Sequence, residues 1–354
     1  MSDPTSPADP AALGAWLDAR GLLPGAGDPE VVALGEGHSN LTFLVRRGGG
    51  ELVLRRPPRG PLLPTAHDVV REARVMALLA SGGFAQVPAV RGVVDDDSVL
   101  GAPFYVMDRS PGVVVREALP PFLADDAAAR RAVGLDLATT LGEIHRVDWR
   151  PFVDAGIGKP SGYLERQLRR WVGQREGIQA AVAAAGGTAR ELPDYDAVRD
   201  WLRAHLPAES EPAVVHGDYK LDNVIVEPTG PRISAVVDWE MATVGDPLMD
   251  LGTALCYWVE LADPPELRAF AFGPTALPGS YTRREFAEHY ARITGRSLAH
   301  LPFYSAFGLY KTAVVAQQIY LRYVRGHSKD ARFAMMIMGV RALADQAERV
   351  IAGC

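Results

Sequence analysis

The segment that decides the fold runs from Val214 to Asp250 and reads VVHGDYKLDNVIVEPTGPRISAVVDWEMATVGDPLMD. Short apolar runs predict strands here. Asp218 and Asn223 fall in a tight loop between two of them, and Asp238 ends the next strand. One carboxylate can orient an attacking hydroxyl, while a second carboxylate and an amide oxygen can hold Mg²⁺ against nucleotide phosphates. The segment therefore predicts a site for phosphoryl transfer.

An ordered set of motifs carries a family resemblance. The set is His216-Gly217-Asp218, then Asn223 five residues after Asp218, then Asp238-Trp239-Glu240. It resembles the aminoglycoside phosphotransferase-like kinase superfamily, and protein kinases carry the related signatures H-R-D-x-x-x-x-N and D-F-G. The stretches GHSNLT, VLRRPP, REARVM and GDPLMDL resemble the branch found as free-standing bacterial proteins and as kinase-like domains fused to acyl-CoA dehydrogenases. The likeness covers roughly residues 30 to 340.

The resemblance implies roles for four residues of this segment. Asp218 would be the catalytic base or the residue that orients the hydroxyl, and Asn223 and Asp238 would be the Mg²⁺ ligands. Lys220, two residues after Asp218, would neutralise the transferred phosphate. The implied activity moves the γ-phosphate of ATP, with GTP as the alternative donor, to a hydroxyl of a small molecule.

Two further residues would support this loop. By the same resemblance His216 would brace it near Asp238, and Asp250 would tie its backbone from the following helix. A lone H-G-D tripeptide is more often a turn, because glycine and aspartate favour turns. The ordered presence of Asn223 and Asp238 favours the catalytic interpretation.

The first 110 residues or so predict a sheet with one helix. The runs VVALGEG, LTFLVRR and ELVLRRP are separated by glycines, apolar residues recur at helical spacing from His67 to Leu79, and VRGVV and FYVMD form a further strand pair. Glycines in the first turn let backbone N–H groups approach phosphate, although this is no P-loop motif and alone would be an ordinary hairpin turn. The residues expected to bind nucleotide there are Gly35, Gly37, His38 and Ser39.

An arginine stands where kinases place a lysine on the third strand. We assign this position to Arg55, pair it with Glu72 on the following helix, and keep Arg56 as the alternative. A planar guanidinium can bridge phosphate oxygens and a carboxylate. The other interpretation is an exposed arginine on an edge strand.

The stretch from Tyr105 to Gly112 resembles the hinge of a kinase. It implies that Met107 packs behind the adenine ring and that the backbone of Asp108 and Ser110 supplies its hydrogen bonds. A strand end followed by a Pro-Gly turn is the alternative. The remainder is mostly helical, with a strong amphipathic pattern from Ala127 to His145.

These patterns together predict an α+β, bilobed protein-kinase-like fold. A small N-lobe of antiparallel sheet with one helix would span residues 1–107, and a larger helical C-lobe would span residues 108–354. The chain of 354 residues has a formal net charge of -6, which gives no general attraction to nucleic acid or to anionic membrane. Two cysteines, no signal-peptide pattern and no long apolar run predict a cytoplasmic protein. The sequence leaves both a monomer and a homodimer open.

The acceptor is expected to be small, because only a few residues separate Asp238 from the next helix. A protein kinase needs a long activation segment there to position a peptide. Cationic and aromatic residues in the helical segments favour an anionic acceptor such as a hydroxy acid or a hydroxyacyl-CoA, unless they are solvated helix faces; they are Tyr163, Arg166, Arg169, Arg170, Trp171, Lys311, Tyr320, Arg322 and Arg325. The alternatives are an aminoglycoside phosphotransferase and a pseudokinase that binds nucleotide without transfer.

Overall fold

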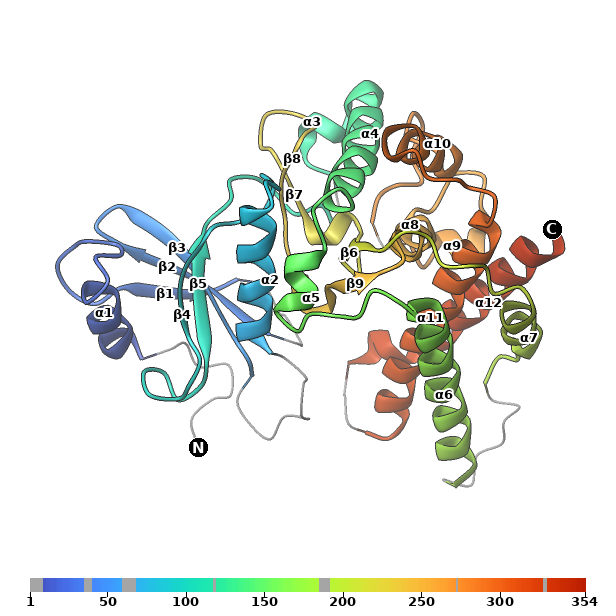
Figure 1. The fold of residues 1–354 in the computed structure, drawn as a ribbon, viewed down its shortest axis with the longest axis horizontal. Coiled ribbons are helices and arrows are strands. Elements are labelled where there is room, and N and C mark those ends of the chain that lie inside the picture. Colours follow the sequence, from blue (N-terminus) through green and yellow to red (C-terminus); the bar gives the residue numbers. More distant parts are fainter. Residues whose placement is uncertain are drawn as a thin grey trace. The chain divides into compact units, whose positions relative to one another are not determined.

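The computed structural model describes residues 9–34, 40–58, 68–116, 119–184, 192–271, 273–326 and 330–354. Its chain forms two compact units (Figure 1). The first comprises Met1–Gly112 and Ser234–Ala242, and the second comprises Val113–Ile233 and Thr243–Cys354. The lobe boundary expected between residues 107 and 108 stays a prediction. A segment distant in sequence, Ser234–Ala242, completes the first unit and carries Asp238 into it.

The first unit is built on a five-stranded antiparallel sheet in the order β1-β2-β3-β5-β4. Its strands are β1 (Glu30–Ala33), β2 (Leu41–Arg47), β3 (Gly50–Arg56), β4 (Val90–Val94) and β5 (Phe104–Asp108). Valine, leucine and phenylalanine dominate these runs, as is usual in strands. The inner strands β2, β3 and β5 are mostly buried, whereas the edge strand β1 is mostly exposed and the edge strand β4 is only partly buried. The register sets Arg55 of β3 opposite Tyr105 of β5.

Two helices accompany this sheet, α1 (Pro10–Asp18) and α2 (Val69–Ser81). Leu13 and Leu17 of α1 pack into one apolar core with Leu54 of β3. Because successive strand residues point to opposite faces, Arg55 points away from that core, to the side where α2 contacts β4 and β5. The alternation therefore directs Arg55 towards α2.

The second unit is mostly helical. Its α-helices are α3 (Pro121–Ala124), α4 (Ala127–Ile144), α5 (Arg150–Asp154), α6 (Tyr163–Ala184), α7 (Asp196–Ala204), α8 (Pro247–Tyr257), α9 (Pro265–Arg268), α10 (Arg283–Thr294), α11 (Leu301–Val324) and α12 (Met336–Ala352). The 3-10 turn η4 (Ala331–Met335) leads directly into α12. No helix among the described ranges is long and apolar enough to cross a membrane.

Short strands frame the loop that carries Asp218. β6 (Ala213–Val215) pairs antiparallel with β9 (Thr243–Gly245), and the chain passes from β6 through the 3-10 turn η2 (Leu221–Asn223) into β7 (Val224–Val226). A turn closed by the N–H of Glu227 donating to the carbonyl oxygen of Arg232 at 2.8 Å leads to β8 (Ile233–Val236). Another 3-10 turn, η3 (Trp239–Met241), follows Asp238.

Helices α8 and α11 approach each other closely through their backbones. A Cβ atom on Gly252 of α8 would lie 2.2 Å from the carbonyl oxygen of Tyr304, and one on Gly308 of α11 would lie 2.5 Å from the carbonyl oxygen of Gly252. Only glycine allows backbones to approach this closely. Every residue of α8 is buried, so the helix forms the centre of this unit.

The start of α10 gives a stability prediction. Glu285 accepts hydrogen bonds from the N–H and the hydroxyl of Thr282, both at 2.8 Å, in a capping box, and it pairs with Arg131. The bond from Arg131, with those from Thr282, lowers the pKa of Glu285 to about 2. Because the folded pKa lies below the unfolded value, this stabilisation is complete above the unfolded pKa and is lost as pH falls through the folded pKa. We expect Glu285→Ala to lower the free energy of unfolding by about 1 kcal/mol at neutral pH.

Urea denaturation at several pH values measures this difference. The gap between the wild type and Glu285→Ala should shrink as the pH falls from about 5 towards 2. Glu288→Ala, one turn further along α10, is the matched control and should leave stability nearly unchanged. A pH-independent gap would contradict the assigned cause.

Candidate active site

The loop from His216 to Asn223 is held at its start by α8. Asp250 accepts the backbone N–H of His216 at 2.5 Å and that of Gly217 at 2.7 Å. Gly217 has a φ of 84°, which favours glycine and lets the chain turn sharply before Asp218. Burial raises the pKa of the Asp250 carboxyl, but bonds from His145 and this backbone lower it overall. The carboxylate is therefore ionised and tethers the loop.

Asp218 is held through both carboxylate oxygens. Its Oδ2 lies 2.9 Å from Nζ of Lys220 and accepts Nδ2 of Asn223 at 3.2 Å, while its Oδ1 accepts the hydroxyl of Tyr257 at 3.0 Å. Burial raises the pKa of Asp218, but the ammonium groups of Lys220 and Lys311 lower it overall. The carboxylate stays charged and has a fixed direction.

Asn223 is oriented by the same residue. Its Nδ2 also donates to the carbonyl oxygen of Asp218 at 2.8 Å. Both contacts use the nitrogen, and among the described residues none is made to the Oδ1 of Asn223. The amide oxygen is therefore directed away from Asp218 and is suited to bind a hard cation.

The first unit gathers a second cluster around Arg55. Its Nε lies 3.1 Å from Glu72 Oε2, and its NH2 group binds Oδ1 of Asp238. Oε1 of Glu72 accepts the backbone N–H of Trp239 at 3.2 Å. Burial raises the pKa of Glu72 to about 7, against the opposing effect of Arg55. Arg56 is directed elsewhere, with NH1 donating to the carbonyl oxygen of Leu100 at 3.2 Å.

The backbone of Asp238 is strained. Its φ of 67° is in the left-handed region, which is uncommon for residues other than glycine, and it lies immediately before η3. The contact to Arg55 and the tie of Trp239 to Glu72 hold this conformation. Strained residues often occur at functional sites, and here the strain fixes where the carboxylate points.

The other residues expected to contact nucleotide are placed as follows. Met107 is buried in β5 opposite Val53 of β3. The N–H of Asp108 donates to the carbonyl oxygen of Ala89 at 2.9 Å. A backbone hydrogen bond from Asp108 to a ligand would therefore have to use the carbonyl oxygen of Asp108. Ser110 follows β5 and is partly exposed. Four of the predicted residues lie outside the described residues: Gly35, Gly37, His38 and Ser39.

Two residues make contacts at the loop that the sequence interpretation missed. Tyr257 contacts Asp218, and Lys311 of α11, which we expected to bind the acceptor, donates from Nζ to the carbonyl oxygen of Gly217 at 2.5 Å. One signal for Tyr257 was available: it stands seven residues after Asp250, two helical turns along the same face. No pattern in the sequence singles out Lys311.

The arginines of α6 differ in their surroundings. Arg169 forms an exposed pair with Glu165 at 2.7 Å, which is the solvated helix face considered above. Arg166 binds the carbonyl oxygen of Ser161, and the guanidinium of Arg170 lies 5.5 Å from the ring centroid of Trp171. Local contacts therefore account for all three cations.

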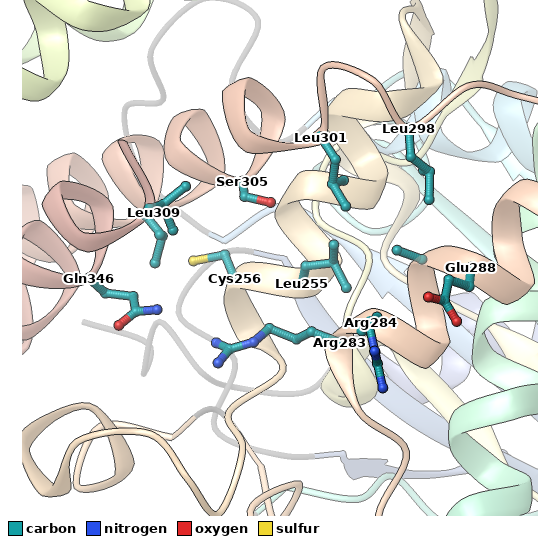
Figure 2. Close-up of a pocket in the computed structure, with 12 residues that line it drawn as sticks. Leu255, Cys256, Arg283, Arg284, Glu288, Leu298, Leu301, Ser305, Leu309 and Gln346 are labelled. Carbon is teal, nitrogen blue, oxygen red and sulfur yellow. The ribbon is translucent and has the colours of Figure 1, made fainter. Parts of the chain in front are cut away.

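A pocket of about 340 Å³ lies among α8, α10, α11 and α12 (Figure 2). Its lining is largely apolar, with Leu255, Leu301 and Leu309 pointing into it beside Cys256. None of the predicted site residues lines it. The pocket and the loop from His216 to Asn223 are separate features of this unit.

Comparison with known proteins finds relatives along most of the chain. The model of the phosphotransferase enzyme family (APH) matches residues 30–288. Acyl-CoA dehydrogenase family member 11 of Gallus gallus is 36% identical over 324 residues, covering 88% of this chain and 39% of that protein. Acyl-CoA dehydrogenase family member 10 of Mus musculus is 32% identical over 307 residues, covering 86% of this chain and 28% of that protein. The chain thus spans well under half the length of these relatives.

Solved structures share the fold. A candidate aminoglycoside phosphotransferase of Ralstonia eutropha matches with a TM-score of 0.78 and 29% identity, over 97% of this chain and 98% of that chain. A mutant of aminoglycoside phosphotransferase APH(4)-Ia in complex with AMP-PNP and hygromycin B matches with a TM-score of 0.60 and 16% identity, over 97% of this chain and 100% of that chain. The predicted α+β kinase-like fold is confirmed.

Proposed function

Because this chain belongs to the phosphotransferase enzyme family, we propose that it transfers the γ-phosphate of ATP to a hydroxyl group of a small molecule. The observation that carries the proposal is the Asp218 carboxylate. It is charged, held through both oxygens and flanked by the ammonium of Lys220. A carboxylate fixed beside a cation suits a reaction in which a hydroxyl must be aimed at a phosphorus atom.

Asp218 would act mainly by orientation. The acceptor oxygen forms a bond to the γ-phosphorus, the bond from that phosphorus to the bridging oxygen of ADP breaks, and the hydroxyl proton passes to Asp218. Phosphoryl transfer is largely dissociative, so the proton can leave late and a weak base suffices. Lys220, 2.9 Å from Asp218, would compensate negative charge on the transferred group.

Asn223 and Asp238 have the chemistry to hold Mg²⁺. The amide oxygen of Asn223 faces away from Asp218, and the Oδ1 of Asp238 is bound by Arg55, which leaves Oδ2 for a ligand. Both groups offer the hard oxygen atoms that this ion prefers. When bound, Mg²⁺ would neutralise charge on the nucleotide phosphates. Arg55 would fix the direction of Asp238, with Glu72 holding Arg55 at its Nε.

The remaining nucleotide contacts are proposed from the family pattern. Gly35, Gly37, His38 and Ser39 would approach the phosphates, and Met107, with the backbone of Asp108 and Ser110, would surround the adenine. The fold is shared with a structure whose ligands are AMP-PNP and hygromycin B, which supports a nucleotide donor and a small acceptor.

Charge and chain length support a small, anionic acceptor. Helix α8 begins at Pro247, soon after Asp238, so no long segment is present to position a peptide. The ammonium groups of Lys220 and Lys311 lie at the catalytic loop and would repel a polycation. The relatives are named as acyl-CoA dehydrogenases, which supports a hydroxy acid or a hydroxyacyl-CoA thioester. An aminoglycoside acceptor and a pseudokinase are the alternatives.

Transfer of radioactive phosphate from γ-labelled ATP with Mg²⁺ tests the proposal. The panel is 3-hydroxybutyrate, 3-hydroxybutyryl-CoA, kanamycin and hygromycin B, with Asp218→Asn as background. We expect labelling of an anionic member and none of the aminoglycosides. Labelling of the aminoglycosides alone would contradict the acceptor assignment. If neither phosphate transfer nor ATP hydrolysis exceeds the background, the chain is a pseudokinase.

A further inference from the structure

Tyr257 occupies a special place in the frame of the catalytic loop. It is the last residue of α8, and its side chain is buried. Asp250, two turns earlier on the same helix, binds the backbone N–H groups just before Asp218. Residues seven positions apart lie on one helical face. A single face of α8 therefore holds the backbone of the loop at one end and its catalytic side chain at the other.

Tyr257 contacts both charged groups of the proposed transfer site. Its hydroxyl donates to Oδ1 of Asp218 at 3.0 Å, and Nζ of Lys220 lies 4.7 Å from the centroid of its ring. Lys220 in turn binds Oδ2 of Asp218 at 2.9 Å. The three side chains thus form a closed set in which each member contacts the other two.

Tyr257 binds the oxygen of Asp218 that Lys220 and Asn223 do not bind. Lys220 and Asn223 both bind Oδ2, so without the phenol the Oδ1 oxygen of Asp218 would lose its described partner and the carboxylate could rotate. The flexible Lys220 side chain would likewise lose the aromatic surface that limits its motion. Burial, with the neighbouring Asp218 charge, raises the pKa of Tyr257 well above its usual value, so the phenol remains a donor.

We propose that Tyr257 is a positioning residue for phosphoryl transfer, which holds the carboxylate of Asp218 and the ammonium of Lys220 in one fixed arrangement. This inference rests on the proposed function. Tyr257 acts on the reacting groups indirectly, through its contacts with Asp218 and Lys220. One lone pair of Oδ1 accepts the phenol, which leaves the other for the hydroxyl of the acceptor.

Two substitutions separate the two contacts. Tyr257→Phe removes the hydroxyl and keeps the ring, whereas Tyr257→Leu removes both. With Mg²⁺·ATP and water as the acceptor, we expect kcat to fall about tenfold for Tyr257→Phe and about a hundredfold for Tyr257→Leu. The KM for ATP should be unchanged for Tyr257→Phe, because the lost hydroxyl contacts Asp218, which orients the acceptor and not the nucleotide.

Tyr304→Phe is the matched control. Tyr304 of α11 is also buried and donates to a carboxylate, Oδ2 of Asp246, at 2.9 Å, but it does not touch the catalytic loop. This variant should lose thermal stability comparably to Tyr257→Phe and retain kcat. Equal losses of kcat in the two variants would show a merely structural role and overturn the proposal.

The remaining outcomes are equally decisive. An unchanged kcat in Tyr257→Phe would overturn the inference, and an increased kcat would show that the phenol occupies the place of the acceptor. If the wild type neither transfers nor hydrolyses, the proposed function fails, and a crystal structure of Tyr257→Phe tests the inference by itself. A rotated or disordered Asp218 carboxylate supports it, and an unmoved carboxylate overturns it.

Discussion

Asp218→Asn is expected to reduce phosphoryl transfer about a thousandfold and to leave nucleotide binding nearly intact. The amide keeps the shape of the side chain, but it cannot accept the hydroxyl proton, and its nitrogen would face a donor, either Lys220 or the hydroxyl of Tyr257. Phosphate transfer from labelled ATP measures the rate, and calorimetric titration with Mg²⁺·ADP measures the affinity.

A matched variant separates the effect of losing the Asp218 carboxylate from the general effect of losing one negative charge. Asp345→Asn removes one carboxylate from an exposed position on α12 and should keep full activity. Substantial turnover by Asp218→Asn would remove this residue from the reaction. Loss of nucleotide affinity together with turnover would instead indicate that Asp218 supports the fold of the site.

Arg55→Met is the second change with a large expected effect, here on stability. It leaves the buried carboxylate of Glu72 and the carboxylate of Asp238 without their shared cation. Removing one partner of a buried ion pair typically lowers the free energy of unfolding by about 3–5 kcal/mol. Because Asp238 would lose its orientation, binding of Mg²⁺·ATP should weaken as well. Urea denaturation and calorimetric titration measure the two effects.

Two comparison variants sharpen this test. Arg46→Met removes an exposed arginine of β2 that pairs with Glu30 and Glu51 and should leave the free energy of unfolding nearly unchanged. Arg55→Met combined with Glu72→Leu should be more stable than Arg55→Met alone, because no buried charge of Glu72 is left unpaired. Equal stability of Arg46→Met and Arg55→Met would contradict the importance assigned to the cluster.

Motif spacing was sufficient for the fold and for the chain positions proposed for the site. The H-G-D and Asn223 spacing, with Asp238 after the next strand, indicated a kinase-like fold, which the structural matches confirm. The choice between Arg55 and Arg56 could not be made from sequence, because adjacent strand residues point to opposite faces and the pattern does not say which face α2 covers. The structure places Arg55 at Glu72.

Contacts between helices were the part that could not be predicted. Tyr257 reaches Asp218 only because α8 packs with one particular face against the loop, and a buried helix has no polar face to reveal its orientation. Lys311 was one of several cations in the C-terminal helices, and only the packing of α11 directs it to Gly217. Their proposed roles depend on tertiary packing, which local periodicity does not encode.

The glycine contact between α8 and α11 has a mechanical consequence. Backbones that meet at Gly252 and Gly308 cannot slide or separate without losing that fit. Since α8 carries Asp250 and α11 carries Lys311, the two helices and the loop they grip form one stiff block. A change in the distance between α8 and α11 would also displace the loop that both helices contact. A change of acceptor selectivity in this chain would therefore require substitutions of side chains around these helices, with the helices kept in place.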